Sequence, residues 1–203
     1  MASEPGRGRP RDPRTQQAIM RATRTLLARD GYDQLSIEAI AKEAGVSRPT
    51  IYRRWPSKAH VVFDAAFGDT PGADAVFAGT DDFRTDLRRF VRDALDFWGQ
   101  PVVSTAVLGI LAERERDPAL HIRTQQLLDE QTLSGFAALV RRGVEQGVIR
   151  ADVDVDMLYH LLISTTFYAV VVQQDSHTSD LADLVDRLSA LVLQGAGTER
   201  TTE

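Results

Sequence analysis

The chain has 203 residues, of which 43% are hydrophobic, and its formal net charge is −5. It contains no cysteine, which excludes disulfide bonds, thiolate catalysis and cysteine-based zinc sites. No signal peptide and no run of about 20 apolar residues occurs, so we expect a soluble cytoplasmic protein with no membrane partner.

The charge is divided unevenly along the chain. Residues 1–60 carry 12 Lys and Arg against 6 Asp and Glu, a net of +6, whereas residues 61–203 carry 12 against 23, a net of −11. A basic front end attracts nucleic-acid phosphates and releases their counterions, while an acidic body is repelled from them. This division predicts that the N-terminal part binds double-stranded DNA.

Residues 1–13 are expected to form a flexible basic arm. The segment is polar and rich in Gly and Pro, so it lacks the apolar residues that folding requires. Its arginines are Arg7, Arg9 and Arg11, and the order Arg-Gly-Arg-Pro resembles the core of an AT-hook. Arginines on such an arm can enter the minor groove of A·T-rich DNA. The alternative is a disordered tail whose charge only aids solubility.

Two helices are predicted after the arm. The first starts at Pro13, a favoured first position, and ends at Gly31. Ser36 caps the second, whose apolar residues recur at helical spacing. Gly45 ends it, because glycine takes the left-handed conformation at little cost.

A third helix is predicted from Arg48 to Trp55, capped by Ser47 and ended by Pro56. Its apolar residues lie on one side, and its opposite side is cationic, aromatic and hydroxylic. Such a helix fits the major groove, where its N-terminal residues reach base edges. The residues placed to reach bases are Arg48, Pro49, Thr50 and Tyr52, and those suited to phosphate are Ser47, Thr50, Arg54 and Lys58. The alternative is a plain amphipathic helix pair.

The order of residues in this stretch resembles a known family. Gly-Tyr at 31–32, Ser-Ile-Glu-Ala-Ile-Ala at 36–41, Gly-Val-Ser at 45–47, Thr-Ile-Tyr at 50–52 and Trp-Pro-Ser-Lys at 55–58 are similar to the DNA-binding domain of TetR-family regulators. The resemblance covers residues 14–67, including a connecting helix. It implies an all-helical homodimer with a three-helix DNA-binding domain and a helical effector-binding core. The family's typical DNA contacts match Ser36, Arg48, Pro49, Thr50, Tyr52, Arg53, Arg54 and Lys58, with the tyrosine and lysine on phosphate.

Downstream, every segment from 80 to 194 is helical in pattern, and no strand-like alternation appears. The predicted helices cover 80–98, 101–116, 118–146, 155–174 and a last one near 181–192. Thr80 or Asp81 caps the first of these. Residues 195–203 are expected to form a disordered tail. The fold class is therefore all-α: a helix-turn-helix domain followed by a helical bundle for effector binding and dimerisation.

The helix predicted at 155–174 is apolar on all sides, so it must be buried on more than one side. Its apolar part, Met157 to Val172, is interrupted by polar residues and is too short for a convincing membrane span. Together with the last helix it can form half of an intermolecular four-helix bundle. The expected dimer interface is Leu158, Leu161, Leu162, Thr165, Leu181, Leu184, Val185, Leu188 and Leu191.

An effector pocket is expected between the helices of the second domain, chiefly because the family resemblance implies one. Its expected lining is Phe97, Trp98, Leu108, Leu111, Phe136, His160, Phe167 and Tyr168. Each of these residues can equally belong to an ordinary core. An apolar, aromatic lining favours a hydrophobic or amphipathic effector.

Other chemical-looking clusters have structural explanations. The acidic residues at 152, 154 and 156 lack the glycine and glutamate of a calcium loop, and we expect them to cap the next helix. Glu113 and Arg114 lie in a charged run that indicates a solvated face. The four histidines are scattered, so no metal site is expected, nor is any cofactor or enzymatic activity.

We therefore expect a sequence-specific transcriptional repressor that binds a palindromic operator as a dimer and is released by a small molecule. Two alternatives stay open. The first is an architectural DNA-binding protein without strong sequence specificity. The second is a small-molecule-binding protein whose N-terminal head docks a protein partner.

Overall fold

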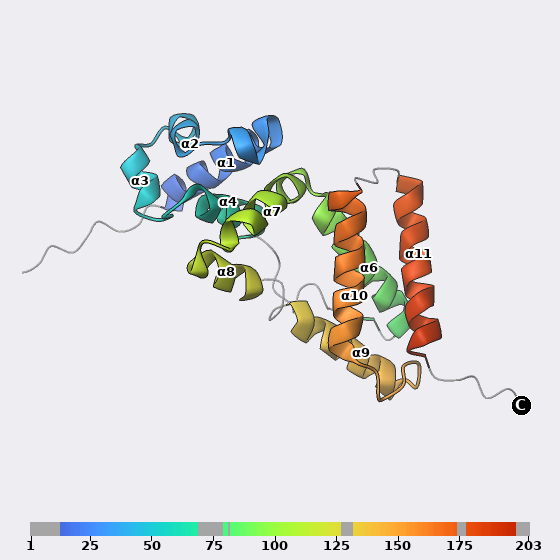
Figure 1. Ribbon diagram of the computed structural model, residues 1–203. Coiled ribbons are helices and arrows are strands. Elements are labelled where there is room, and N and C mark those ends of the chain that lie inside the picture. Colours follow the sequence, from blue (N-terminus) through green and yellow to red (C-terminus); the bar gives the residue numbers. More distant parts are fainter. Residues whose placement is uncertain (1–12, 69–78, 81, 127–131, 174–177, 198–203) are drawn as a thin grey trace, which may run out of the picture.

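The computed structural model describes residues 13–68, 79–80, 82–126, 132–173 and 178–197 (Figure 1). Within these ranges the chain is helical, and its only strand-like feature is a β-bridge between Ile149 and Gly197. The expected all-α class is confirmed. The arm at 1–12, with Arg7, Arg9 and Arg11, lies outside the described residues, as do residues 198–203 of the predicted tail.

The first four helices form an N-terminal head. They are α1 (Pro13–Gln34), α2 (Ile37–Ala44), α3 (Arg48–Tyr52) and α4 (Lys58–Phe67). The chain of α1 leaves helical geometry at Gly31, whose φ is 79°, where the sequence predicted the helix to end. A short turn follows Gly31 before α2 begins, so Tyr32 is carried back into the head, where it is buried.

The predicted caps of α2 form, whereas the predicted Ser47 cap of α3 does not, and Ser57 at the start of α4 behaves in the same way. The Ser36 side chain accepts a hydrogen bond from the backbone N–H of Ala39 at 3.1 Å, and Gly45 adopts φ 66° at the C-cap. Ser47 and Ser57 stand at N-cap positions but make no side-chain cap. Their hydroxyls are bonded elsewhere, Ser47 to Thr50 Oγ1 at 2.9 Å and Ser57 to His60 Nδ1 at 3.0 Å.

Helix α3 is shorter than expected, because it ends at Tyr52 rather than at Trp55. The backbone N–H of Trp55 still donates to the carbonyl of Ile51 at 3.0 Å, so a helical turn continues beyond the regular helix. This turn brings the Trp55 ring into the head core, where it is 3% exposed.

The remaining helices are α6 (Phe83–Gly99), α7 (Pro101–Arg114), α8 (Pro118–Gln125), α9 (Thr132–Glu145), α10 (Val155–Phe167), the π-helical turn η2 (Tyr168–Val172) and α11 (Thr178–Gly195). In Figure 1, α6, α9, α10 and α11 form a second lobe, and α7 and α8 lie beside the head. The cap of α6 is Asp82, whose carboxylate accepts from the N–H groups of Arg84 and Thr85, in place of the expected Thr80 or Asp81.

One predicted boundary is corrected by the structure, and another prediction is left open. A single helix was predicted at 118–146, and the structure places α8 and α9 in this region. Residues 127–131 between them lie outside the described part, so the continuity of that helix is untested. Ala196 is buried, and its carbonyl accepts from the Arg150 N–H at 3.0 Å. Residues 195–197 are therefore part of the fold and not of a disordered tail.

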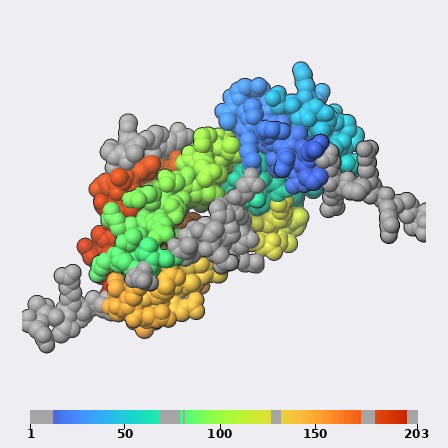
Figure 2. Space-filling model, turned by 180° about the vertical axis from the view of Figure 1, so that it is seen from behind, coloured from blue at the N-terminus to red at the C-terminus, as the bar shows by residue number. Residues whose placement is uncertain are grey.

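Two hydrophobic cores hold the molecule together. The first joins the head to α7, and it includes Trp98 and Leu120; the second joins α6, α9, α10 and α11 around Phe90, Phe136 and Tyr159. Helix α7 packs against both α1 and α4, although it follows α6 in the chain. Figure 2 shows the resulting two lobes, with the blue and cyan head at one end and the red α11 at the other.

Residues 155–172, which cover α10 and η2, are long and apolar enough to cross a membrane by length and composition. A core helix of a soluble protein passes the same test. About 33% of this stretch is buried, including Leu158 and Leu162, which pack against the rest of the second lobe, and a single such helix is weak evidence for a membrane span.

Candidate DNA-binding face and effector cavity

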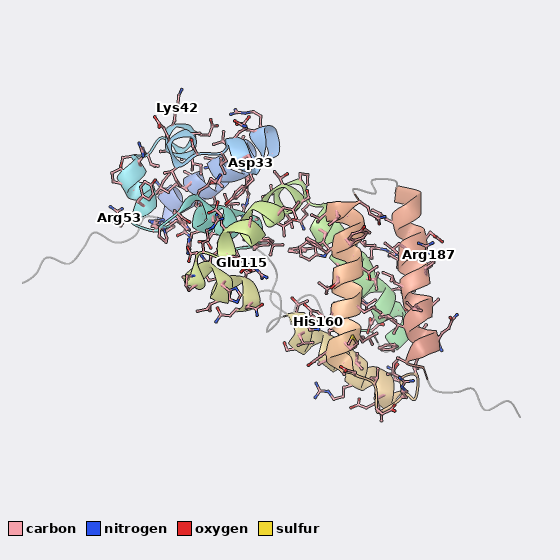
Figure 3. The ribbon with its side chains drawn as sticks, viewed as in Figure 1. Asp33, Lys42, Arg53, Glu115, His160 and Arg187 are labelled. Carbon is pink, nitrogen blue, oxygen red and sulfur yellow. The ribbon has the colours of Figure 1, made fainter. Side chains whose placement is uncertain are left out.

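The outer side of α3 presents a free cationic and aromatic face. Ile51 is fully buried, whereas Arg48, Pro49, Tyr52 and Arg53 are exposed. Neither arginine side chain has a hydrogen-bond or ion-pair partner among the described residues. Figure 3 shows Arg53 projecting from the outer end of the head, and Figure 1 places α3 at the end of the molecule far from α10 and α11. This face is therefore open to a large partner.

The hydroxyl and amide groups around this face are partly engaged within the head. The Ser47 and Thr50 hydroxyls bond to each other at 2.9 Å, and the Arg54 guanidinium donates to Gln16 of α1 at 3.4 Å. Ser36 is exposed at the N-terminus of α2, where free backbone N–H groups and the helix dipole favour an anion. Thr50 and Arg54 were predicted to contact phosphate and Ser36 to contact DNA, and these roles stay predictions.

Lys58, the expected phosphate contact at the start of α4, is engaged inside the head. Its ammonium donates to the Tyr32 carbonyl at 3.0 Å and lies 4.1 Å from the centroid of the Tyr32 ring. An ammonium has three N–H donors, so this contact leaves two for a phosphate. The interaction also ties the start of α4 to the end of α1.

A cavity of about 250 Å³ lies where the head core meets α6, α8 and α10. Such a volume is close to the lower end of the range of about 300 to 1,000 Å³ that small-molecule sites occupy. Its walls are mostly apolar, with four aromatic rings. The lining residues are Phe63, Phe67, Trp98, Val107, Ile110, Leu111, Arg114, Thr124, Ile163, Ser164 and Phe167.

Three of the eight residues predicted for a pocket line this cavity: Trp98, Leu111 and Phe167. Phe97 packs beside it, with its ring centroid 4.9 Å from that of Trp98. Sequence reasoning missed Phe63 and Phe67 of α4. The available signal was that α4 is apolar on more sides than a simple connecting helix needs.

The other four predicted residues lie elsewhere. Leu108 and Tyr168 are each 53% exposed, because they lie on the outer sides of their helices. Phe136 is fully buried in the second core. His160 is exposed on α10, and its Nδ1 lies 2.6 Å from the Asp156 carbonyl (Figure 3).

The charged run at the end of α7 is not simply a solvated face. Glu113 accepts a hydrogen bond from the Tyr32 hydroxyl, and Arg114 lines the cavity. Burial and the hydrogen bond to Glu113 raise the pKa of Tyr32 far above its ordinary value. The hydroxyl is therefore neutral and acts as the donor.

Helices α1 and α7 approach each other closely at Gly109. A Cβ placed there would lie 2.3 Å from Cδ1 of the Tyr32 ring, so only glycine allows this contact without a shift. Tyr32 thus touches Gly109, Glu113 and Lys58, and it links α1, α4 and α7 at one point.

On α4, Asp64 links the end of the recognition segment to α8. It accepts from the indole N–H of Trp55 at 2.5 Å and forms an ion pair with Arg123 of α8. The Arg123 guanidinium also lies over the Phe63 ring, 4.6 Å from its centroid. Helix α4 therefore contacts the cavity through Phe63, and through Asp64 it contacts Trp55, just beyond the end of α3.

The comparison with known families decides the assignment. Residues 19–65 match the model for bacterial regulatory proteins of the tetR family, and residues 77–188 match that for the tetracyclin repressor-like C-terminal domain. The chain belongs to the TetR family of transcriptional regulators. It is a DNA-binding regulator, as its head geometry indicates.

Relatives span nearly the whole chain. An HTH-type transcriptional regulator of Mycobacterium bovis is 30% identical over 92% of this chain and 91% of its own length. The DNA-binding transcriptional repressor TetR of Mycobacteroides abscessus is 32% identical over 70% of this chain and 74% of its own. A transcriptional regulator of Saccharomonospora viridis, solved in complex with choline, shares the fold with a TM-score of 0.71 and 23% identity, covering 93% of this chain and 100% of that one.

TetR-family regulators act as dimers, and the expected interface residues fall into two groups. Four are buried within the protomer, where they build the second core: Leu158, Leu162, Val185 and Leu188. Leu161 and Leu191 are exposed, and Leu181, Leu184 and Thr165 are half-buried. Three exposed apolar residues that were not predicted adjoin them: Met157, Tyr168 and Val172.

The described residues contain no cluster of His, Asp and Glu that could hold a metal ion. Asp154 caps α10 by accepting from the Met157 N–H at 2.9 Å, as the sequence predicted for this acidic run. Asp156 adds negative charge to the first turn of the same helix, where the helix dipole favours it.

Proposed function

We propose that this TetR-family regulator is a homodimeric repressor that occupies a two-fold symmetric operator and leaves it when a small effector binds. The observation that carries the proposal is the free face of α3, made of Arg48, Pro49, Tyr52 and Arg53, at the outer end of the head. Arg48 can read guanine through two hydrogen bonds in the major groove. The phosphate contacts proposed beside it are Ser36, Ser47, Thr50, Arg54 and Lys58.

The dimer forms through α10, η2 and α11. Met157, Leu161, Tyr168 and Val172 follow one another at spacings of 4, 7 and 4 residues, which places them on one side of a helix, and all are exposed. Pairing this side and Leu191 of α11 with a second copy would form a four-helix bundle. Two-fold symmetry then presents two α3 helices to successive major grooves, about 34 to 36 Å apart or wider.

The effector site is the cavity lined by α4, α6, α7, α8 and α10. Its apolar walls support a hydrophobic or amphipathic molecule of modest size. The Saccharomonospora viridis regulator was solved in complex with choline, but at 23% identity the comparison supports a shared fold and does not support a shared ligand. No resident cofactor is proposed.

Release from DNA is proposed to pass through α4 and α7. Each helix contacts the cavity on one side and the head on the other, α4 through Phe63 and Asp64, and α7 through Arg114 and Glu113. An effector that fits a different placement of these helices lowers the population of the DNA-binding arrangement. The coupling free energy is about 1 to 3 kcal/mol in typical cases.

Affinity selection of genomic fragments by the full-length protein, at about 150 mM salt, tests the proposal. Recovery of one palindromic site supports a specific regulator. Recovery of broadly A·T-rich fragments without a motif would replace it with an architectural role. Recovery of no DNA would indicate that the head docks a protein partner. Family membership implies that these events take place in the cytoplasm.

A further inference from the structure

The walls of the effector cavity are mostly apolar, but they also include one charged side chain and a few polar groups. Among the described residues that line it, Arg114 is the only one with a charged side chain, and none is an Asp or a Glu. Thr124 donates its hydroxyl proton to the Leu120 carbonyl at 2.8 Å, so that donor is already used. The other side chains with N–H or O–H donors in the described wall are those of Arg114, Ser164 and Trp98.

Arg114 is weakly neutralised by its neighbours. Its side chain is 26% exposed, and its ion pair with Glu115 is long, at 3.9 Å, to a carboxylate that is 73% exposed. The adjacent Glu113 is already hydrogen-bonded to the Tyr32 hydroxyl. A guanidinium beside apolar walls, with little opposing charge, attracts an anion and repels a cation more strongly than it would in water.

Trp98 supplies the second observation. The residue is 4% exposed and lines the cavity, yet its buried indole N–H has no hydrogen-bond partner among the described residues. An indole N–H can only donate, and buried donors in folded proteins are nearly always paired. The N–H itself is closed off from the cavity in this structure, so a bound molecule supplies the missing acceptor when the ring or its neighbours shift and an oxygen is presented to it.

We propose that the effector is a small amphipathic carboxylate. Its apolar body lies among Phe63, Phe67 and Phe167, its carboxylate pairs with Arg114, and one of its oxygens accepts from Trp98. The inference rests on the proposed effector site and names the class of molecule that occupies it. It separates this cavity from one that holds a cation such as choline.

Isothermal titration of the full-length protein with matched probes tests the inference. The probes are 3-phenylpropanoate, 3-phenylpropanol and 3-phenylpropylamine, together with hexanoate, hexanol and hexylamine. Each acid should bind at least about tenfold tighter than the alcohol with the same body, and each amine should bind weakest. Equal affinity for the three head groups, a preference for the amines, or no acid binding at millimolar concentration would overturn the proposal.

Substitutions test which residues cause the preference for acids over alcohols. Arg114→Gln should reduce the acid-to-alcohol ratio to about one while alcohol binding changes by less than about twofold. Arg116→Gln, which removes the same charge from an exposed position outside the cavity, should keep the wild-type ratio. Trp98→Phe keeps a ring in the wall but lacks the N–H, and it should weaken the acids by about three- to tenfold. Unchanged acid affinity in that variant would remove Trp98 from the site. The acid-to-alcohol affinity ratio of the wild-type protein tests the proposed ligand class even if a variant folds poorly.

Release of operator DNA is measured separately. An acid that binds with the expected preference but does not release the operator would contradict the effector role in the proposed function and leave the ligand class standing. Release by alcohols and amines as readily as by acids would keep the effector role and overturn the ligand class.

Discussion

The indole N–H of Trp55 donates a hydrogen bond to Oδ2 of Asp64 at 2.5 Å, and the other carboxylate oxygen of Asp64 pairs with Arg123. Through these two contacts, the Asp64 side chain of α4 contacts both Trp55, just beyond the end of α3, and α8. Phe63, the residue before Asp64, lines the cavity. An altered position of α4 therefore acts on Trp55, just beyond the end of α3.

Asp64→Asn should weaken this link. The substitution keeps the size of the side chain but removes its charge, so we expect the free energy of unfolding to fall by about 1 to 2 kcal/mol. Operator affinity should fall as well, because Trp55 loses its anchor. Urea unfolding and operator binding measure the two effects. Asp33→Asn, at an exposed position of the same head, is the control and should change neither. Wild-type stability in Asp64→Asn would show that water replaces the contact.

Gly109→Ala should be destabilising by about 1 to 3 kcal/mol, because the added Cβ would overlap the buried Tyr32 ring. Gly99→Ala is the matched control, since a Cβ at that position meets nothing within 4 Å and its φ is not in the left-handed region. Comparison of the urea midpoints of the two variants tests the contact. A neutral Gly109→Ala would mean that α1 and α7 separate at little cost.

Arg48→Ala should reduce affinity for the selected operator by about 1 to 3 kcal/mol and relax the preference at one base per half-site. Binding to a set of operators with single base changes measures both effects. Arg29→Ala removes an exposed positive charge from α1 and controls for net charge. If Arg48→Ala weakened all sequences equally, Arg48 would contact phosphate and not a base.

Leu161→Arg should disrupt the dimer. It places a charge on the exposed side of α10, so the dimer dissociation constant should rise by at least tenfold, about 1.4 kcal/mol. Operator binding should fall with it, because each half-site alone binds weakly. Leu108→Arg, at a similarly exposed leucine of α7, should leave the dimer intact. Sedimentation equilibrium distinguishes them, and an unaffected Leu161→Arg dimer would place the interface elsewhere.

The raised pKa of Tyr32 predicts that the free energy of unfolding depends on pH. Its pKa is raised in the folded protein by burial and by Glu113, while in the unfolded chain it is about 10. The stability that results is fully present below pH 10 and is lost as pH rises further, at about 1.4 kcal/mol per pH unit. Tyr32→Phe should remove that part of the slope, measured by urea unfolding between pH 8 and 11. Tyr52→Phe, which removes an exposed phenol, is the control. A wild-type slope in Tyr32→Phe would assign the loss to other groups.

Local signals predicted much of the head. The caps of α2, the glycine turn and the split between apolar and cationic sides are properties of neighbouring residues, so α1, α2 and the exposed face of α3 followed from the sequence. The length of α3 did not, because Trp55 is drawn into the core by contacts with residues elsewhere in the chain.

The cavity and the dimer face could be predicted only in part, because both depend on how distant helices pack. Periodicity shows that α10 is apolar on several sides, but it cannot tell which side faces the protomer's own core. Leu158 and Leu162 face that core, and Leu161 does not. Arg114 illustrates the same limit, since a charged run gives no sign that one member turns toward an apolar cavity.

The fit between Gly109 and Tyr32 bears on the construction of chimeric regulators. Gly109 belongs to the C-terminal domain and the Tyr32 ring to the head. The ring can occupy its position only because Gly109 has no Cβ. A head grafted onto a foreign sensor domain would meet a Cβ at this point wherever that domain carries another residue. Exchange of DNA specificities between relatives should therefore succeed most readily when this pair is transplanted together.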